Sequence, residues 1–555
     1  MSTATRHHSY PFQGSGAEVQ AIRFPYERSV DQDADSPVVH PIVIVGAGPA
    51  GLSLAIDLAM RHQPVVLIDN DHQLSFGSRA LCFAKRTLEI WDRLGVGQAM
   101  VDKGVSWNLG KVFFHNDELY QFNLLPEEGH ERPAFINLQQ YYCEGYLVQR
   151  ALELEYLDIR WGNKLTGLKT YDDHSELTIE TPDGPYQMQA QWVIACDGGR
   201  STTRQLMGLE SKGQIFQDRF LIADVKMTAD FPTERWFWFD PPFHPNQSVL
   251  LHREPDNVWR IDFQLGWDAD PEKEKKPENI IPRVQALLGK DTEFTLEWAS
   301  VYTFACLRMD KFVHGRVIFA GDSAHGVSPF GARGANSGVQ DTDNLAWKLD
   351  WVLRELAPSS LIDTYAIERE FAADENILNS TRSTDFITPK SPISRLFRDA
   401  TLGLAKEFEF ARRIVNSGRL SVPATLTQST LNTPDTDAFN GKQVPGAPLT
   451  DAPIKKPDGQ ASWLLRELGH DFTLIVFGEA PAWASKIPHT QTVVVGEDIF
   501  DAQGLLAQRL DASQGTAYLI RPDQHVCARW RNPSEDDVKK ALVKATAGST
   551  KILGA

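Results

Sequence analysis

Three glycines between a β-branched run and an amphipathic stretch constrain the fold of this 555-residue chain most strongly. The pattern Gly46-x-Gly48-x-x-Gly51 directly follows the apolar residues 42–45. In residues 49–61, apolar side chains then recur at spacings of three and four, which is typical of one face of a helix. These features predict a buried strand, a tight turn and a helix, which is the start of a Rossmann-like unit.

The same motif predicts a site for a dinucleotide. Gly46 permits the tight turn, Gly48 lets the backbone approach a pyrophosphate, and Gly51 lets the helix pack close to the strand. The helix N-terminus offers free N–H groups to the phosphates. A second strand, 65–68, ends at Asp69, an acid at the distance expected for binding a ribose hydroxyl. A glycine turn with a purely structural role is the alternative, and the pattern does not distinguish NAD from FAD.

Two further motifs place an acid and a glycine directly after an apolar strand. Asp197-Gly198 follows the run WVIA, and Gly321-Asp322 follows VIFA and precedes a second loop, 329–336. Open α/β sheets bind ligands at the carboxyl ends of their strands. Either motif alone is compatible with a surface turn. Their occurrence beside a Rossmann-like start predicts one shared ligand site.

The three motifs together resemble a known family. GAGPAG, ACDGGRSTTR, RVIFAGDSAHGVSPFGARGANSGVQDTDNLAWKL and TYAIER are similar to the single-component FAD-dependent aromatic hydroxylases, over about residues 41–420. The nearest resemblance is to the 3-(3-hydroxyphenyl)propionate hydroxylase and phenol hydroxylase-like branch. It implies FAD as cofactor, NAD(P)H as electron donor and O2 as co-substrate. It also implies hydroxylation of a phenolic substrate through a flavin hydroperoxide, in the degradation of aromatic compounds.

The resemblance assigns the FAD contacts residue by residue. It places Asp69 at the adenosine ribose, Arg79 along the FAD, and Asp322 at the ribityl chain. Arg333 departs from the family pattern, which has glutamine there, and is expected to add a charge near the flavin ring. The residues expected to bind FAD are Gly46, Gly48, Pro49, Ala50, Gly51, Asp69, Arg79, Gln140, Asp197, Gly198, Gly321, Asp322, Pro329, Gly334, Ala335 and Asn336.

An aromatic-rich segment, about residues 216–304, is expected to form the substrate domain. Its alternating pattern predicts a mostly antiparallel sheet inserted into the FAD domain, as a roof over the flavin ring. His252 and Tyr302 are weak candidates for assisting phenol deprotonation, against the alternative of a hydrogen-bonded structural role, so the catalytic base stays unassigned. The residues expected to line the site are Trp236, Phe237, Trp238, Phe239, His252, Arg260 and Asp262.

The predicted fold class combines α/β and α+β architecture. Residues 1–40 are interpreted as a loose N-terminal extension, because they are polar and lack periodicity. The FAD-binding monooxygenase core spans 41–420, and the Thr-, Pro- and Asn-rich residues 421–445 form a linker. The last unit, 446–555, resembles the thioredoxin-like extension of this branch. It has no CxxC pair, so we expect a role in packing or assembly.

Composition narrows the partners and the location. The formal charge of −17 argues against binding a nucleic acid. Five scattered cysteines without a CxxC pair indicate a reducing compartment, no disulfide framework and no metal site. No apolar run is long enough for a signal peptide or a membrane span, so we expect a cytoplasmic protein with a small aromatic substrate. Whether the chain forms a homodimer stays open.

Two rival functions use the same FAD-binding features. A flavin-dependent reductase or halogenase would share the fold, although the chain has no WxWxIP-type segment typical of halogenases. A non-catalytic FAD-binding protein is the rival from another class. The intact glycines and acids of all three motifs argue against it.

Overall fold

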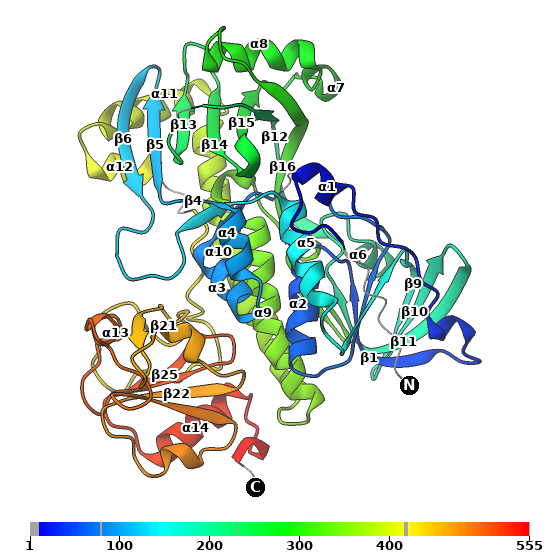
Figure 1. Cartoon of the computed structure of the whole chain (residues 1–555), viewed down its shortest axis with the longest axis vertical. Helices are drawn as coiled ribbons and strands as arrows, with labels where there is room; N and C mark the ends of the chain where they lie inside the picture. Colours follow the sequence, from blue (N-terminus) through cyan, green and yellow to red (C-terminus); the bar gives the residue numbers. More distant parts are fainter. Residues whose placement is uncertain (1–9, 78–79, 230, 416–419, 554–555) are drawn as a thin grey trace.

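The computed structural model describes residues 10–77, 80–229, 231–415 and 420–553. They form a mostly parallel sheet flanked by helices, a mostly antiparallel sheet and a smaller C-terminal unit. In Figure 1 the antiparallel sheet lies at the top, the parallel sheet at the right and the C-terminal unit at the lower left. This arrangement confirms the predicted combination of a Rossmann-like sheet with an antiparallel sheet.

The parallel sheet contains the strands that lead into the three motifs. Ile42, Val43 and Ile44 of its central strand are fully buried, because both faces of the parallel sheet are covered. Its five parallel strands, in the order β18-β11-β1-β2-β8, are Val317–Phe319, Gly184–Ala195, Val38–Val45, Val65–Asp69 and Leu157–Trp161. An antiparallel extension completes this sheet. Strand β11 forms a hairpin with β10 (Ser175–Thr181), β10 pairs with β9 (Lys164–Thr170), and β17 (Val313–His314) pairs with β18.

Helix α2 (Pro49–Met60) contacts both α5 (Gln140–Ala151) and α9 (Gly334–Leu353), and α9 contacts α10 (Ser360–Ile387). The segment 85–103 forms two helices. Gly95, with φ of 88°, follows the end of the first helix, α3 (Lys85–Arg93), and separates it from the second, α4 (Gly97–Lys103). Before them, β3 (Cys82–Ala84) joins β7 (Phe135–Asn137) and β4 (Val105–Trp107) in a small sheet.

The antiparallel sheet is larger than the predicted insert of 216–304. It also takes two strands from an earlier part of the chain, β5 (Leu109–Phe114) and β6 (Asp117–Asn123), and β5 pairs parallel with β13. Helices α7 (Pro271–Glu274) and α8 (Pro277–Leu288) follow β15. The other strands, in the order β19-β16-β12-β15-β14-β13, are His325–Gly326, Thr295–Met309, Ser211–Lys226, Val258–Leu265, Ser248–Arg253 and Arg235–Phe239.

The C-terminal part begins with a segment, 420–452, that contains no assigned helix or strand and packs on the core through Leu426, Ser429 and Leu431. It continues into a four-stranded sheet in the order β23-β22-β24-β25 and a two-stranded pair β20-β21. These strands are Thr490–Val495, Phe472–Phe477, Ala517–Ile520, Val526–Trp530, Pro453–Lys455 and Ala461–Trp463; the helices are α13 (Leu505–Arg509) and α14 (Glu535–Ala545).

The prediction of a loose N-terminal extension is wrong for its described residues. Residues 10–37 pack on the parallel-sheet domain, and α1 (Gly16–Gln20) is stabilised by a capping box between Ser15 and Glu18. Phe12, Val19, Ile22 and Phe24 are buried in the main core. Four apolar side chains within a polar stretch are enough to dock it, although they follow no helical or strand period. Three further α-helices are α6 (Thr202–Leu206), α11 (Pro392–Ala405) and α12 (Glu409–Val415).

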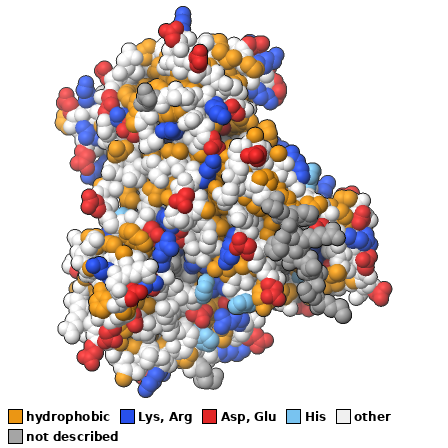
Figure 2. Space-filling model, viewed as in Figure 1, with side chains coloured by type: hydrophobic (Ala, Val, Ile, Leu, Met, Phe, Trp, Pro, Cys, Tyr) orange, Lys and Arg blue, Asp and Glu red, His pale blue; other side chains and the backbone are white. Residues whose placement is uncertain are grey.

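The surface carries both signs of charge. On the face shown in Figure 2, acidic and basic side chains are intermixed, without a broad area of one sign. Among the helices of the described residues, none has the length and apolar character that crossing a membrane requires.

Candidate active site

The first glycine loop has the geometry that the sequence predicted. Gly46 has φ of 105°, and a Cβ there would lie 2.5 Å from the carbonyl oxygen of Cys196. A Cβ on Gly51 would lie 1.9 Å from the carbonyl oxygen of Gly46. Gly48 differs, because no atom lies within 4 Å of its Cβ position. The packing of the chain therefore requires glycine at 46 and 51, whereas Gly48 leaves an open approach to the first turn of α2, as pyrophosphate binding needs.

Asp69 holds this loop to the end of β2. Its Oδ2 accepts the N–H of Ala47 at 2.6 Å, and its Oδ1 accepts the N–H of Asp71 at 2.8 Å. Burial raises the pKa of Asp69, and these two hydrogen bonds oppose the shift. The carboxylate thus has a structural role in the loop, and its contact with a ribose remains a prediction.

The second motif offers a carboxylate oxygen with no partner. Asp197 Oδ2 accepts hydrogen bonds from the backbone N–H and the hydroxyl of Thr203, at 2.8 and 2.9 Å. Asp197 Oδ1 is buried without a hydrogen-bond partner among the described residues. Gly198 has φ of 75°, and the space beside its Cβ position is free to 4 Å. A buried acceptor beside open space fits a ligand with a hydroxyl or N–H donor.

The third motif meets the first at a close contact of three elements. A Cβ on Gly321 would lie 3.3 Å from the Cβ of Ala50 and 3.7 Å from the Cα of Gly338. Gly321 belongs to the 3-10 helix η3 (Gly321–Ser323), Ala50 to α2 and Gly338 to α9. Small residues at all three positions let the elements approach, and this places the N-termini of α2 and α9 at one site.

Asp322 lies exposed at the start of α9. Its Oδ1 is 3.8 Å from the Cβ position of Gly334, the first residue of that helix. Neighbouring Ser323 is buried, and its hydroxyl donates to the carbonyl oxygen of Ala195 at 2.6 Å. Arg204 donates to the carbonyl oxygen of Ser323 at 2.7 Å. The second and third motifs are therefore joined by hydrogen bonds, and both of these bonds involve Ser323.

The loop before α9 is held from two sides. Asn336 donates to the carbonyl oxygen of Cys82 at 2.9 Å and accepts the N–H of Ala84 at 2.8 Å. Arg333 is 1% exposed and donates to Asn376 Oδ1 at 3.0 Å on α10. The expectation that Arg333 adds a charge near the flavin ring remains a prediction. Pro329 is exposed, in the 3-10 helix η4 (Pro329–Gly331), and Ala335 is half-buried.

Gln140 shapes the segment that precedes β3. Its Oε1 accepts the N–H of Ala80 at 2.9 Å, and its Nε2 donates to Ser75 Oγ at 2.9 Å and to Glu144 Oε1 at 2.7 Å. Glu144 in turn accepts the backbone N–H of Ser75 at 2.7 Å. The predicted FAD residue Arg79 lies outside the described residues. Gln140 and Glu144, one turn apart on the same helix, thus hold the chain on both sides of Arg79 by hydrogen bonds to Ser75 and Ala80.

One face of the antiparallel sheet packs against the third motif. Phe330, from η4, contacts the rings of Phe220 and Phe304 at centroid distances of 4.8 and 5.2 Å. Phe237 and Phe239 belong to this inner cluster. The prediction that Trp236 and Trp238 line the site is wrong, because side chains alternate along β13 and both tryptophans pack on the opposite, outer face.

The two candidate bases, His252 and Tyr302, lie in different surroundings. His252 is 3% exposed, and its Nε2 lies 3.4 Å from Asp262 Oδ2. Burial holds the pKa of His252 at about 4, which makes this imidazole a weak base at neutral pH. Tyr302 lies opposite Phe220 on β16 and packs against the inner cluster. A role of either residue in deprotonation stays a prediction.

The predicted lining residues His252, Arg260 and Asp262 belong to a charged row on the same inner face, and the sequence motifs did not identify its other members, Asp224 and Arg235. Arg260 donates to both oxygens of Asp224, at 2.8 and 2.9 Å, and lies 3.2 Å from Glu254. Arg235 lies at the start of β13, which pairs with β14. Charged residues within aromatic strands were the only signal that could have indicated this row.

A surface pocket of about 400 Å³ lies elsewhere, at the carboxyl ends of α2 and α9. It is formed with the C-terminal unit and contains none of the predicted FAD residues. Its lining includes Arg61, His62, Arg354, His470 and His489.

Comparison with known proteins decides the family. Residues 40–380 match the model of a family described as "FAD binding domain". The chain belongs to the FAD-binding monooxygenase family. This membership confirms the predicted cofactor FAD, the use of NAD(P)H and O2, and the predicted class of enzyme, an FAD-dependent aromatic monooxygenase.

Relatives match over most of the chain. A 12-dehydrotetracycline 5-monooxygenase/anhydrotetracycline 6-monooxygenase of Streptomyces rimosus is 27% identical over 514 residues, which cover 88% of this chain and 95% of that protein. A 3-(3-hydroxy-phenyl)propionate/3-hydroxycinnamic acid hydroxylase of Mycolicibacterium gilvum is 25% identical and covers 92% of each. The flavin-dependent monooxygenase PieE, in complex with FAD and substrate, has the same fold, with a TM-score of 0.78 at 20% identity over 94% of this chain and all of that chain.

Proposed function

We propose that this member of the family hydroxylates a phenolic or hydroxyaromatic compound, in the degradation of aromatic compounds. The observation that supports this most directly is the contact between Phe330, in the loop before α9, and the aromatic inner face of the antiparallel sheet. That contact sets a surface suited to an aromatic ring against the elements that fit FAD. The relatives named above are, by their names, a hydroxylase of 3-(3-hydroxy-phenyl)propionate and 3-hydroxycinnamic acid and a monooxygenase of tetracycline precursors.

The residues that fit FAD come from four parts of the chain. We propose that the first turn of α2, opened by Gly48, binds the pyrophosphate, and that Asp322 binds the ribityl chain. Asp197 Oδ1, which is buried and unpartnered, would accept a hydrogen bond from the cofactor. The resemblance places Arg79 along the same cofactor. Bound FAD would supply the redox chemistry, taking up hydride from NAD(P)H and activating O2.

The chain itself contributes position, charge and exclusion of water. The first turn of α9 leaves N–H groups without helical partners, and these stabilise negative charge at the site. Asn336 fixes that turn against β3 by hydrogen bonds to Cys82 and Ala84. The inner face, with Phe220, Phe237 and Phe304, excludes water from the bound aromatic ring.

The test measures NAD(P)H consumption and the origin of the new oxygen atom. A panel of hydroxylated aromatic acids, phenols and catechols is supplied with isotopically labelled O2. We expect slow oxidation of NAD(P)H alone, much faster oxidation with a matching phenol, and label in the product. New oxygen that derives from water would contradict the proposal. NAD(P)H oxidation that no phenol accelerates, in a protein that binds FAD, would favour the rival reductase.

A further inference from the structure

One arginine on the inner face of the antiparallel sheet is buried without a partner. Arg235 is 6% exposed, and its Nη1 has no hydrogen-bond partner among the described residues. No carboxylate of those residues lies within ion-pair distance of its guanidinium. Other buried arginines are paired, for example Arg260 with Asp224 and Arg369 with Asp341. Arg235 is therefore a buried positive charge that forms no ion pair among the described residues.

The register places Arg235 in a row of charged side chains. Arg260 on β15 lies opposite Asp224 on β12 and opposite His252 on β14. Phe237 lies opposite Leu250, two residues before His252, and side chains two apart on a strand share a face. Arg235, two residues before Phe237, therefore lies beside His252 on the inner face.

The neighbours of Arg235 also have unpaired polar atoms. His252 Nδ1 and Asp262 Oδ1 are buried without hydrogen-bond partners among the described residues. Burial alone would raise the pKa of Asp262, but the hydrogen bond from His252 and the charges of Arg260 and Arg235 outweigh it and lower this pKa. Both oxygens of Glu254 are buried without a hydrogen bond, although Oε1 lies 3.2 Å from Arg260, and burial, reinforced by the charge of Asp224, raises the pKa of Glu254 well above the usual range.

These groups do not neutralise Arg235 by contact. Asp224 is engaged by Arg260 through both of its oxygens. The raised pKa of Glu254 favours its neutral form. Asp262 has one oxygen 3.4 Å from His252, and the charge of Arg235 contributes to its lowered pKa without an ion-pair contact between the two. A buried charge without an ion pair is strongly unfavourable, so a bound anion at this position would remove a large desolvation cost.

The apolar part of the inner face begins next to Arg235. Phe237 and Phe239 follow it on the same strand face, each step of two residues being about 7 Å long. Both rings belong to the cluster that contains Phe330 of the loop before α9. An aromatic ring that packs on this cluster would lie about 7 Å from Arg235. A short side chain that ends in a carboxylate could span that distance.

We propose that Arg235 binds the carboxylate of an aromatic acid substrate, and so selects acids over neutral phenols. The proposal rests on the proposed function for the identity of the ring as substrate. His252 Nδ1 and Asp262 Oδ1 lie in the same row and are suited to polar groups of the same molecule. Arginine suits this role because its planar guanidinium can bind both oxygens of a carboxylate.

The first experiment measures ligand binding without turnover. The FAD-loaded protein is titrated with phenylacetate and 3-phenylpropionate, and with their carboxamides, and binding is followed by the change in flavin absorbance. We expect the carboxylates to bind more tightly than the amides, and Arg235→Met to weaken only carboxylate binding, by about tenfold to a hundredfold. Arg235→Lys should retain part of the preference. Arg253→Met is the matched control, because Arg253 lies over the ring of Trp259, which packs in the outer cluster.

A second measurement separates binding from a structural role. Arg260→Met should lower the thermal midpoint of the protein, because it leaves Asp224 buried and unpaired. Arg235→Met should not lower it, because it removes an unpaired charge. An equal loss in both variants, or equal binding of acids and amides, would overturn the proposal. So would an Arg235→Met variant whose KM rises for NAD(P)H and not for the acid, since the anion would then be the phosphate of the reductant. Failure of all phenols to be hydroxylated would reject the proposed function, while these binding results would still decide the role of Arg235.

Discussion

At the scale of single residues, the three glycines of the first motif have separable roles. Gly51→Ala should destabilise the protein with or without FAD, because its Cβ would lie 1.9 Å from the carbonyl oxygen of Gly46. Gly48→Ala should leave the apoprotein as stable as the parent, because no atom lies within 4 Å of the added carbon. It should nevertheless bind FAD weakly, since the methyl group would occupy the approach to the pyrophosphate. Thermal unfolding of the apoproteins and flavin content after FAD loading check both parts. A Gly48→Ala protein that retains full FAD content would contradict this placement of the cofactor.

The burial of His252 predicts that the stability of the protein depends on pH. Burial holds its folded pKa at about 4, below the value of about 6.5 expected in the unfolded chain. The unfolded state therefore takes up a proton first as the pH falls, and stability is lost between pH 6.5 and 4, by up to roughly 3 kcal/mol. Urea unfolding at a series of pH values checks this, with His252→Gln as the comparison. The variant should show a smaller loss over the same window, and an identical pH profile would show that His252 does not titrate as its burial implies.

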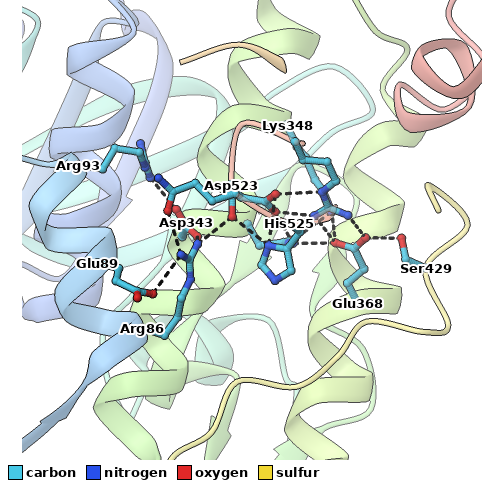
Figure 3. A network of polar contacts seen from close by, with 12 residues as sticks. Arg86, Glu89, Arg93, Asp343, Lys348, Glu368, Ser429, Asp523 and His525 are labelled. Carbon is cyan, nitrogen blue, oxygen red and sulfur yellow. Dashed lines mark hydrogen bonds and ion pairs between the residues drawn. The ribbon is translucent and has the colours of Figure 1, made fainter. Parts of the chain in front are cut away.

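At the scale of elements, a buried charge network joins the C-terminal sheet to α9 and α10 (Figure 3). The carboxylate of Glu368 on α10 accepts hydrogen bonds from Lys348 Nζ at 2.7 Å and from Arg521 Nη1 and Nη2 at 2.6 and 3.0 Å. Burial would raise the pKa of Glu368, but the charges of Arg521 and Lys348 outweigh it and hold this pKa far below its usual range. Ser429, from the segment before the C-terminal unit, also donates to Glu368.

Removal of this carboxylate should be costly. Glu368→Gln leaves buried Lys348 without its anion and leaves Arg521 with Asp523 as its one remaining anion, so we expect a loss of about 3–5 kcal/mol in the free energy of unfolding. Asp536→Asn, which removes an exposed ion pair with Lys540, should cost about 0–1 kcal/mol. Chemical denaturation of both variants measures the difference. Similar losses in the two proteins would mean that the network of Figure 3 contributes no more than a surface pair.

At the scale of the whole molecule, the C-terminal unit covers apolar surface of the FAD domain. Trp347 and Trp351 of α9 are fully buried and pack against Phe472 of β22, at ring-centroid distances of 5.9 and 5.3 Å. We propose a packing role for this unit, as its sequence suggested, and its thioredoxin-like character remains a prediction. Its one cysteine, Cys527, is buried, and burial raises the pKa of its thiol to about 12, which opposes thiol redox chemistry.

A chain that stops at residue 445 tests this packing role. It should express poorly or aggregate, because both tryptophans and the cations around Glu368 would lose their cover. Tryptophan fluorescence of any soluble fraction should shift to longer wavelength. Limited proteolysis of the full chain is the complementary measurement. Cleavage within 421–445 should not release the C-terminal unit, and a freely dissociating fragment would contradict the role.

The sequence by itself determined the FAD domain, because its signals are local. A strand, a glycine turn and a helix are specified by neighbouring residues, and so are the acids that follow β11 and β18. The glycine pattern therefore predicted Gly46, Gly48 and Gly51 with roles that the backbone geometry supports. Family membership was likewise visible in the order of the three motifs.

Only the tertiary structure decided which side chains share a surface. Strand pairing sets the faces of β13, so it directed Phe237 inward and Trp236 outward, although the aromatic run does not distinguish them. Strand pairing also brought β5 and β6 into a sheet whose other strands lie more than 80 residues further along the chain, and it left Arg235 buried without an ion pair among the described residues. Such pairings join residues that are distant in sequence, and their energy depends on burial and partners that no local pattern contains.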